Sequence, residues 1–190
     1  MGLIKIASII ISSSVIATFL SIAFNFIIQN LNYKREYFKK IIDKRIEAQD
    51  FIINIINELK VMTHLDNGKI CNIIFFSGEI RYNNFIVTLA LTKNQSFWLS
   101  DELNDILLEL NIFLLEEISY KIDKYIDSEK DAQLILLGTK NCDKIRDYRI
   151  KIEEQLLENF SNMEQINTFL KSKRKSDFRK EYKIRKKVFL

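Results

Sequence analysis

Proline is absent from all 190 residues of the chain, and only four glycines occur. Neither residue falls between positions 3 and 67, so the sequence contains no helix breaker over that stretch. Sandwiches, barrels and alternating α/β folds need many more turns than this sequence provides. Because 47% of the residues are hydrophobic, the chain can still bury a core. We therefore predict an all-α fold.

An uncharged segment of 23 residues, 6–28, lies near the start of the chain. At about 1.5 Å rise per residue, a helix of this length crosses the ~30 Å hydrocarbon layer of a bilayer. A cleaved signal peptide is the alternative, with small residues at 21–23 as a cleavage site. The apolar run continues beyond that site, which favours an uncleaved anchor. We predict a transmembrane helix within residues 1–30.

Basic residues are unequally distributed around this segment. Lys5 stands alone before it, whereas six follow it: Lys34, Arg35, Lys39, Lys40, Lys44 and Arg45. Because basic flanks of a span remain on the cytoplasmic side, we expect a single-pass protein of the inner (cytoplasmic) membrane whose body is cytoplasmic. Two free cysteines, Cys71 and Cys142, fit that compartment.

Polar side chains form a stripe along the predicted anchor. At 100° per residue, Ser14, Thr18, Ser21 and Asn25 fall within a narrow arc of the helix. Such a stripe is poorly placed against acyl chains, so it favours contact with another helix or with water in a pore. The alternative is that the hydroxyl groups bond to their own helix backbone, which Asn25 does less easily. We predict a homo-oligomer whose pore or helix contacts use these four residues.

The body, residues 31–170, is predicted to be a cytoplasmic bundle of four or five helices that continues from the anchor. Residues 66–68 should end the first helix, and further helices are expected over 70–76, 82–93 and 100–126. Ser100 is the expected N-cap of the last of these, and 94–100 the loop before it. Ser128 and Asp131 are predicted to form a capping box, Gly138 to end that short helix, and Asp143 to begin a long final one.

The last twenty residues, 171–190, form a basic tail of net charge +8, with ten Lys and Arg against two acidic residues. Such a tail can bind anionic lipid or nucleic-acid phosphate, or it can be a solvated helix end. The candidate anion-binding residues are Lys173, Arg174, Lys175, Arg185, Lys186 and Lys187.

Candidate catalytic groups are few. The only histidine, His64, is expected near the end of a helix with Asp66 two residues on, and a surface histidine is the simpler interpretation. No GxGxxG, P-loop or GxSxG motif occurs, and neither metal-ligand spacing nor a cofactor motif is present. We predict no metal site, no cofactor and no enzymatic activity.

Two segments carry a resemblance to a known group of proteins. They are NYKREYFKKIIDKRIEA at 32–48, directly after the single span, and FWLSDELN at 97–104, with Leu110 and Asn111 later. The chain resembles small prokaryotic membrane proteins of phage defence, in particular the accessory proteins of RNA-targeting type VI CRISPR systems and related retron-associated membrane effectors. The resemblance implies a helical domain on a transmembrane helix, assembly into a ring or pore, and an RNA-guided nuclease or its RNA as partner.

Some members of that group are likened to a helical RNase domain in which an arginine precedes a histidine by four to six residues. Neither Arg146 nor Arg149 has a histidine at that spacing, so we expect them to pair with Asp143 and Glu153 across helix turns. The expected function is a membrane-anchored oligomeric accessory effector of antiviral defence that forms a pore or perturbs the inner membrane. The alternatives are a membrane-tethered RNA-binding protein or divergent RNase, and a scaffold that docks a soluble partner through Phe97 and Trp98.

Overall fold

The computed structural model describes the backbone of residues 2–173 and the side chains of residues 16–173. Its first element is helix α1 (Gly2–Lys60). The chain divides into two units, Met1–Ile41 and Ile42–Leu190. The expected long first helix is confirmed. It ends at Lys60, several residues before the predicted stop at 66–68.

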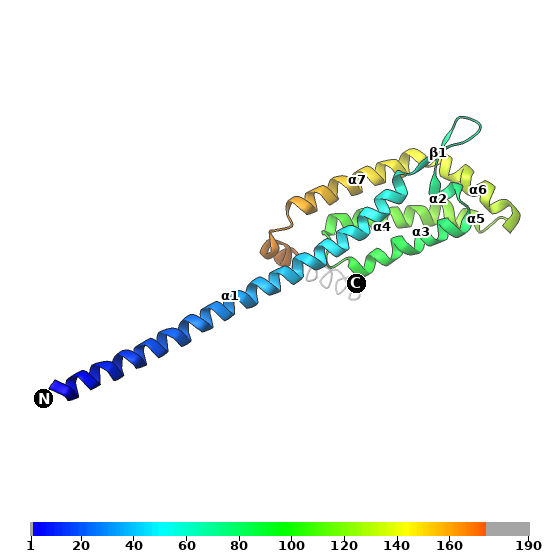
Figure 1. Ribbon diagram of the computed structural model, residues 1–190. Helices are drawn as coiled ribbons and strands as arrows, with labels where there is room; N and C mark the ends of the chain where they lie inside the picture. Colours follow the sequence, from blue (N-terminus) through cyan, green and yellow to red (C-terminus); the bar gives the residue numbers. More distant parts are fainter. Residues whose placement is uncertain (1, 174–190) are drawn as a thin grey trace, which may run out of the picture. The chain divides into compact units, whose positions relative to one another are not determined.

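Beyond α1 the chain forms a short hairpin and a series of helices (Figure 1). In chain order these are β1 (Met62–His64), β2 (Ile70–Asn72), α2 (Ile73–Phe76), α3 (Glu79–Leu91), the 3₁₀ helix η1 (Thr92–Gln95), α4 (Asp101–Leu114), the π-helix η2 (Leu115–Ser119), α5 (Tyr120–Ile122), α6 (Asp127–Lys140) and α7 (Cys142–Ser161). Residues 166–173 are also helical. The structure is mostly helical, as predicted, and it also contains a two-stranded hairpin that was not predicted.

The hairpin corrects the predicted helix at 70–76, which is helical only in its second half. Strands β1 and β2 pair antiparallel, with Met62 opposite Asn72 and His64 opposite Ile70. The turn between them uses Gly68 at φ 75°, a conformation that glycine adopts without strain. A short apolar run has no periodicity that separates strand from helix, so pairing with β1 decides the outcome here.

The core of the helical domain is formed by the apolar faces of its helices, and α4 runs alongside both α3 and α7 (Figure 1). The spacing of apolar residues in the 100–126 helix predicts a buried face of seven residues, and six of them are buried: Leu103, Leu107, Leu110, Phe113, Leu114 and Ile118. The seventh, Ile106, is partly buried against the core. Ser100 is its N-cap, as expected, and its hydroxyl accepts a hydrogen bond from the Leu103 amide. The helical path ends at Ile122 rather than Ile126.

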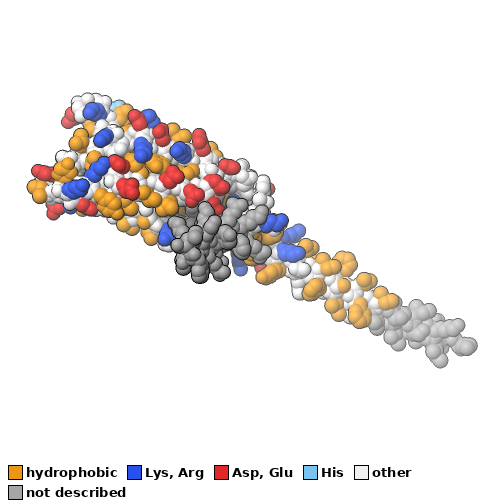
Figure 2. Space-filling view, turned by 180° about the vertical axis from the view of Figure 1, so that it is seen from behind, with side chains coloured by type: hydrophobic (Ala, Val, Ile, Leu, Met, Phe, Trp, Pro, Cys, Tyr) orange, Lys and Arg blue, Asp and Glu red, His pale blue; other side chains and the backbone are white. Residues whose placement is uncertain are grey.

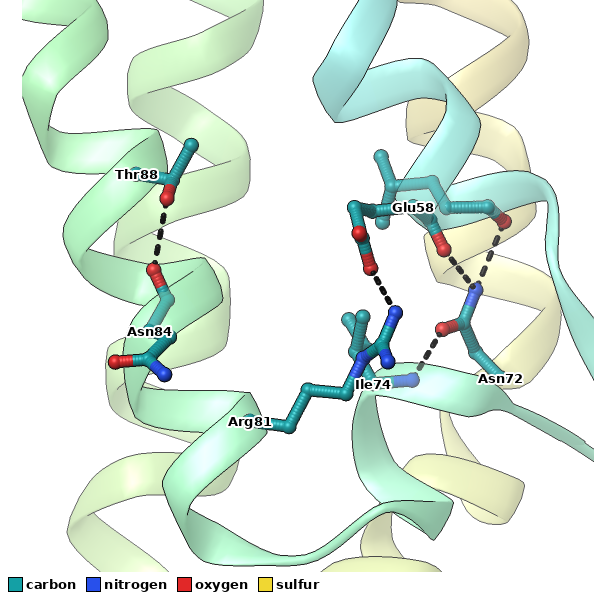
Figure 3. A network of polar contacts seen from close by, with 7 residues as sticks. Glu58, Asn72, Ile74, Arg81, Asn84 and Thr88 are labelled. Atoms are coloured by element: carbon teal, nitrogen blue, oxygen red, sulfur yellow. Dashed lines mark hydrogen bonds and ion pairs between the residues drawn. The ribbon is translucent and has the colours of Figure 1, made fainter.

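The amide side chain of Asn72 joins the end of α1 to the start of α2 (Figure 3). Its Nδ2 donates to the carbonyl oxygens of Leu59, at 2.8 Å, and Glu58, at 3.4 Å. Its Oδ1 accepts a hydrogen bond from the Ile74 amide at 2.9 Å. Asn72 is buried, so one side chain satisfies backbone groups at two helix ends that water does not reach.

Two predicted helix signals have other roles. Gly138 does not end a helix: it lies inside α6, where a Cβ would come within 2.5 Å of the Phe75 ring, so glycine permits close packing of α6 on α2. Asp131 belongs to no capping box, because α6 already begins at Asp127 with Ile126 as N-cap. Its carboxylate instead accepts a hydrogen bond from the Glu79 amide at the start of α3, at 2.9 Å.

A side chain of α3 forms hydrogen bonds at the π-helix η2. The buried Tyr82 hydroxyl on α3 donates to the Leu114 carbonyl oxygen at 3.0 Å and lies 2.9 Å from the Ser119 hydroxyl. Burial raises the pKa of Tyr82 to about 12.

We predict that Asn72→Ala lowers the free energy of unfolding by about 2–3 kcal/mol, because it removes a cap and leaves buried carbonyls unpaired. Urea unfolding followed by Trp98 fluorescence measures the change. Asn84→Ala is the control, since Asn84 is an exposed residue of α3. Equal effects of the two substitutions would contradict the role given to Asn72.

The raised pKa of Tyr82 predicts that the folded chain loses stability at alkaline pH. The unfolded chain releases the phenolic proton near pH 10 and the folded chain near pH 12, so stability falls as pH rises above 10. Between pH 9 and pH 11 the wild type should lose about 1 kcal/mol more than Tyr82→Phe, which has no such proton. Parallel loss in both proteins would show that other groups cause the decline.

Candidate anion-binding site

The polar stripe predicted on the N-terminal segment is only partly within the described side chains. Thr18, Ser21 and Asn25 are exposed and share one face of α1, whereas the side chain of Ser14 lies outside the described range.

Large apolar side chains cover the rest of this helix surface between residues 16 and 31, and Figure 2 shows them on the surface of α1. They are Ile16, Phe19, Leu20, Ile22, Phe24, Phe26, Ile27, Ile28 and Leu31, all exposed. Within the described part of the chain, no helix combines the length and the apolarity needed to cross a bilayer. The first ten residues of the uncharged segment, 6–15, have side chains outside that part.

Of the predicted anion-binding residues in the tail, only Lys173 is described. It is buried, and its ammonium donates to the Asp101 carboxylate at 2.8 Å and to the Ser96 carbonyl at 3.3 Å. This lysine therefore binds an anion of its own chain. Arg174, Lys175, Arg185, Lys186 and Lys187 lie outside the described residues.

One concave site of the described residues, which we call the hairpin cavity, has a predominantly basic polar wall. It has a volume of about 820 Å³ and lies among the end of α1, the β1–β2 hairpin, the end of α6 and the start of α7. Its polar wall carries Lys60, His64, Lys69, Lys140, Arg146 and Arg149, and one carboxylate, Asp143. Its apolar wall carries Leu59, Met62, Ile70 and Leu136.

Ion pairs neutralise part of this wall. Glu153 lies between two of the cations, with Oε1 at 2.8 Å from the Lys60 ammonium and at 3.7 Å from the Arg149 guanidinium. Arg146 pairs with Asp143 at 2.7 Å. The predicted pairings of both arginines are thus confirmed. Lys69 and Lys140 are exposed and form no ion pair within 4 Å of a described carboxylate, although the hydrogen bond from Lys121, and then the charges of Lys144 and Lys140, lower the pKa of Glu117. The cavity therefore keeps positive charge on its surface.

The two cysteines differ in their access to the cavity. Cys142 lines it and is partly exposed, whereas Cys71 is fully buried in the core. Burial, and then the nearby Asp143 carboxylate, raise the pKa of the Cys142 thiol, so it is mostly protonated at neutral pH. Among residues 16–173, no three His, Cys, Asp or Glu side chains cluster in a way that could hold a metal ion.

His64 lies on strand β1, not near the end of a helix as predicted. The hairpin brings it to the same cavity as Arg146, which follows it by more than eighty residues. Sequence reasoning missed this cavity because its wall is assembled from four segments of the chain. The signal in the sequence that could have indicated the cavity is the presence of Lys and Arg residues at the ends of three apolar segments.

Comparison of the chain with protein-family models, with curated proteins and with solved structures finds no match. The function must therefore be argued from the residues and their geometry.

The ion pair between the buried Lys173 and the partly exposed Asp101 predicts a stability effect at the base of the tail. Lys173→Gln should lower the free energy of unfolding by about 1–2 kcal/mol, because a charge-assisted hydrogen bond of a buried ammonium is lost. Lys171→Gln removes the same charge from an exposed neighbour and should have little effect. Urea unfolding of the two variants at equal salt tests the difference, and identical midpoints would contradict it.

Proposed function

We propose that the chain is a single-span inner-membrane protein whose anchor self-associates and whose helical domain acts as an accessory effector of antiviral defence. The observation that carries the proposal is the uncharged segment 6–28, whose described side chains are apolar around most of the helix. From Ile16 to Leu31 the exposed apolar residues cover about two-thirds of the helix circumference. An apolar surface of this extent is unfavourable in water and favourable in lipid.

The remaining third of the circumference supports self-association. Thr18, Ser21 and Asn25 occupy the sector that the apolar residues leave open, and Gln29 extends it. Copies that turn this sector toward one another place their amides and hydroxyls away from acyl chains. Several copies around a common axis would line a pore with the same groups.

The orientation follows from the charge asymmetry around the segment. Six basic residues follow it within residues 34–45, and one precedes it. The positive-inside rule then places the helical domain in the cytoplasm.

The assignment to defence rests on the resemblance to accessory membrane proteins of type VI CRISPR and retron systems. On that basis the partners are further copies of the chain, the lipid bilayer and an RNA-guided nuclease or its RNA.

A membrane-tethered RNA-binding protein or RNase is the second candidate, because the hairpin cavity unites His64 with Arg146 and Arg149. Both arginines are engaged by carboxylates, and the described wall has no Phe, Tyr or Trp on which a base could stack.

A scaffold that docks a soluble partner is the third candidate function. Its candidate contact is Phe97, which is 47% exposed and packs edge-on against Trp98 at 4.8 Å between ring centroids.

The polar sector predicts a sharp contrast between two pairs of substitutions. Thr18→Leu with Asn25→Leu removes polar groups that stabilise helix contacts by about 0.6–2 kcal/mol each, and it makes a lumen apolar enough to exclude water. Dye leakage from vesicles or inner-membrane conductance should fall sharply.

The matched control is Leu20→Ile with Ile27→Leu, on the opposite side of the helix, where the side chains would face lipid. The control should leave leakage unchanged. If wild type and the Thr18/Asn25 variant leak equally at matched expression and oligomer size, the pore is excluded and the scaffold is favoured.

The topology predicts that a reporter fused after Leu190 is active when it requires the cytoplasm and inactive when it requires the periplasm. The fusion protein should sediment with membranes and resist extraction by high salt or alkaline carbonate. Release by carbonate would show that residues 6–28 do not span the bilayer, whatever the domain does.

A further inference from the structure

The hairpin cavity combines exposed positive charge with an exposed apolar wall. On the polar side, Lys69 directly precedes β2 and Lys140 is the last residue of α6. Neither lysine forms an ion pair with a described residue. On the apolar side, Met62, Ile70 and Leu136 are 36%, 43% and 59% exposed. Both kinds of group remain available to a ligand.

The chemistry of the wall restricts the ligand. Five Lys and Arg residues line the cavity against two nearby carboxylates, Asp143 in the wall and Glu153 beside it, so the site keeps a net positive charge that suits a negatively charged ligand. The apolar wall is built from Leu, Met and Ile side chains and, within the described residues, includes no Phe, Tyr or Trp. An aliphatic portion therefore fits it better than a nucleobase, which proteins usually stack on aromatic rings. The volume of about 820 Å³ lies within the range of small-molecule sites.

We propose that the hairpin cavity binds an anionic amphiphile, a molecule with a phosphate or carboxylate head and an aliphatic portion. Lys69 and Lys140 contact the head, and Met62, Ile70 and Leu136 contact the aliphatic portion. This inference is independent of the function proposed for the anchor. The ligand can come from solution or be a lipid of a bilayer, since both present the same head and chain.

Cys142 supplies a direct measurement of occupancy. It lines the cavity and is partly exposed, so a ligand in the cavity should slow its alkylation. The buried Cys71 reports unfolding in the same sample. The full-length chain is placed in neutral phosphatidylcholine nanodiscs, treated with N-ethylmaleimide at pH 8, and analysed by mass spectrometry with hexyl phosphate, hexanol or inorganic phosphate present.

Hexyl phosphate should slow the modification of Cys142 at least fivefold and leave Cys71 unreactive. Hexanol has only the aliphatic portion of the ligand, and inorganic phosphate has only its anionic head. Each should therefore need at least a tenfold higher concentration for the same protection of Cys142. No protection by hexyl phosphate, or equal protection by hexanol, would overturn the proposal. Stronger protection by an RNA oligonucleotide would also overturn it and favour a nucleic-acid site.

A pair of variants tests the two lysines. Lys69→Gln with Lys140→Gln should raise the hexyl phosphate concentration needed for protection about tenfold or more, because two charge-assisted contacts are lost. Lys93→Gln with Lys124→Gln removes the same charge at exposed positions outside the cavity wall and should change nothing. An equal rise in the required hexyl phosphate concentration in both pairs of variants would show that only net charge matters. It would overturn the assignment of Lys69 and Lys140 to the ligand's head.

Vesicles that contain phosphatidylglycerol separate the two sources of ligand. Protection by such vesicles, as strong as that by hexyl phosphate, identifies a bilayer lipid as the ligand. Protection only by the dispersed molecule identifies a soluble one.

Discussion

The amide of Asn72 is the contact on which the arrangement around the hairpin depends. Helix α1 stops at Lys60 with carbonyl groups that have no partner in their own helix, and the first amides of α2, which starts at Ile73, likewise have no acceptor within α2. Asn72 satisfies both ends at once, through its contacts with Leu59, Glu58 and Ile74. A carboxylate could accept from Ile74 but could not donate, and a hydroxyl could not reach both ends with separate atoms. The reversal of the chain at this point therefore requires an amide.

The hairpin cavity is a consequence of that reversal. Because α1 ends where β1 begins, Leu59 and Lys60 lie next to Met62 and His64 on one wall of the cavity. Strand β2 returns to the same place and adds Lys69 and Ile70. Close packing of α6 on α2, which Gly138 allows against Phe75, then places the end of α6 within reach of the hairpin. The cavity thus depends on two features, the buried Asn72 cap and the missing Cβ of Gly138.

Sequence reasoning succeeded where the decisive interactions are local. The buried face of α4 and the Ser100 cap both depend on residues within a few turns of one helix, and both were predicted. So were the pairs Arg146–Asp143 and Arg149–Glu153. The errors involve partners far along the chain. Asp131 looked like part of a capping box, but its partner is the Glu79 amide, and Gly138 looked like a helix stop, but its role is set by Phe75.

The cations of the helical domain separate into two groups by what surrounds them. Arg45 is 4% exposed, donates to the Met163 carbonyl at 2.7 Å and lies over the Phe169 ring, and its burial lowers its pKa. Lys173 is also buried and has Asp101 as its anion. Both hold residues 162–173 against the rest of the domain, so their charges serve the fold. Lys69 and Lys140 differ: both are exposed, neither forms an ion pair within 4 Å of a described carboxylate, and exposed apolar side chains line the same cavity. Their charges are not taken up by buried contacts of the fold and lie beside uncovered apolar surface, so both remain available to an anionic amphiphile.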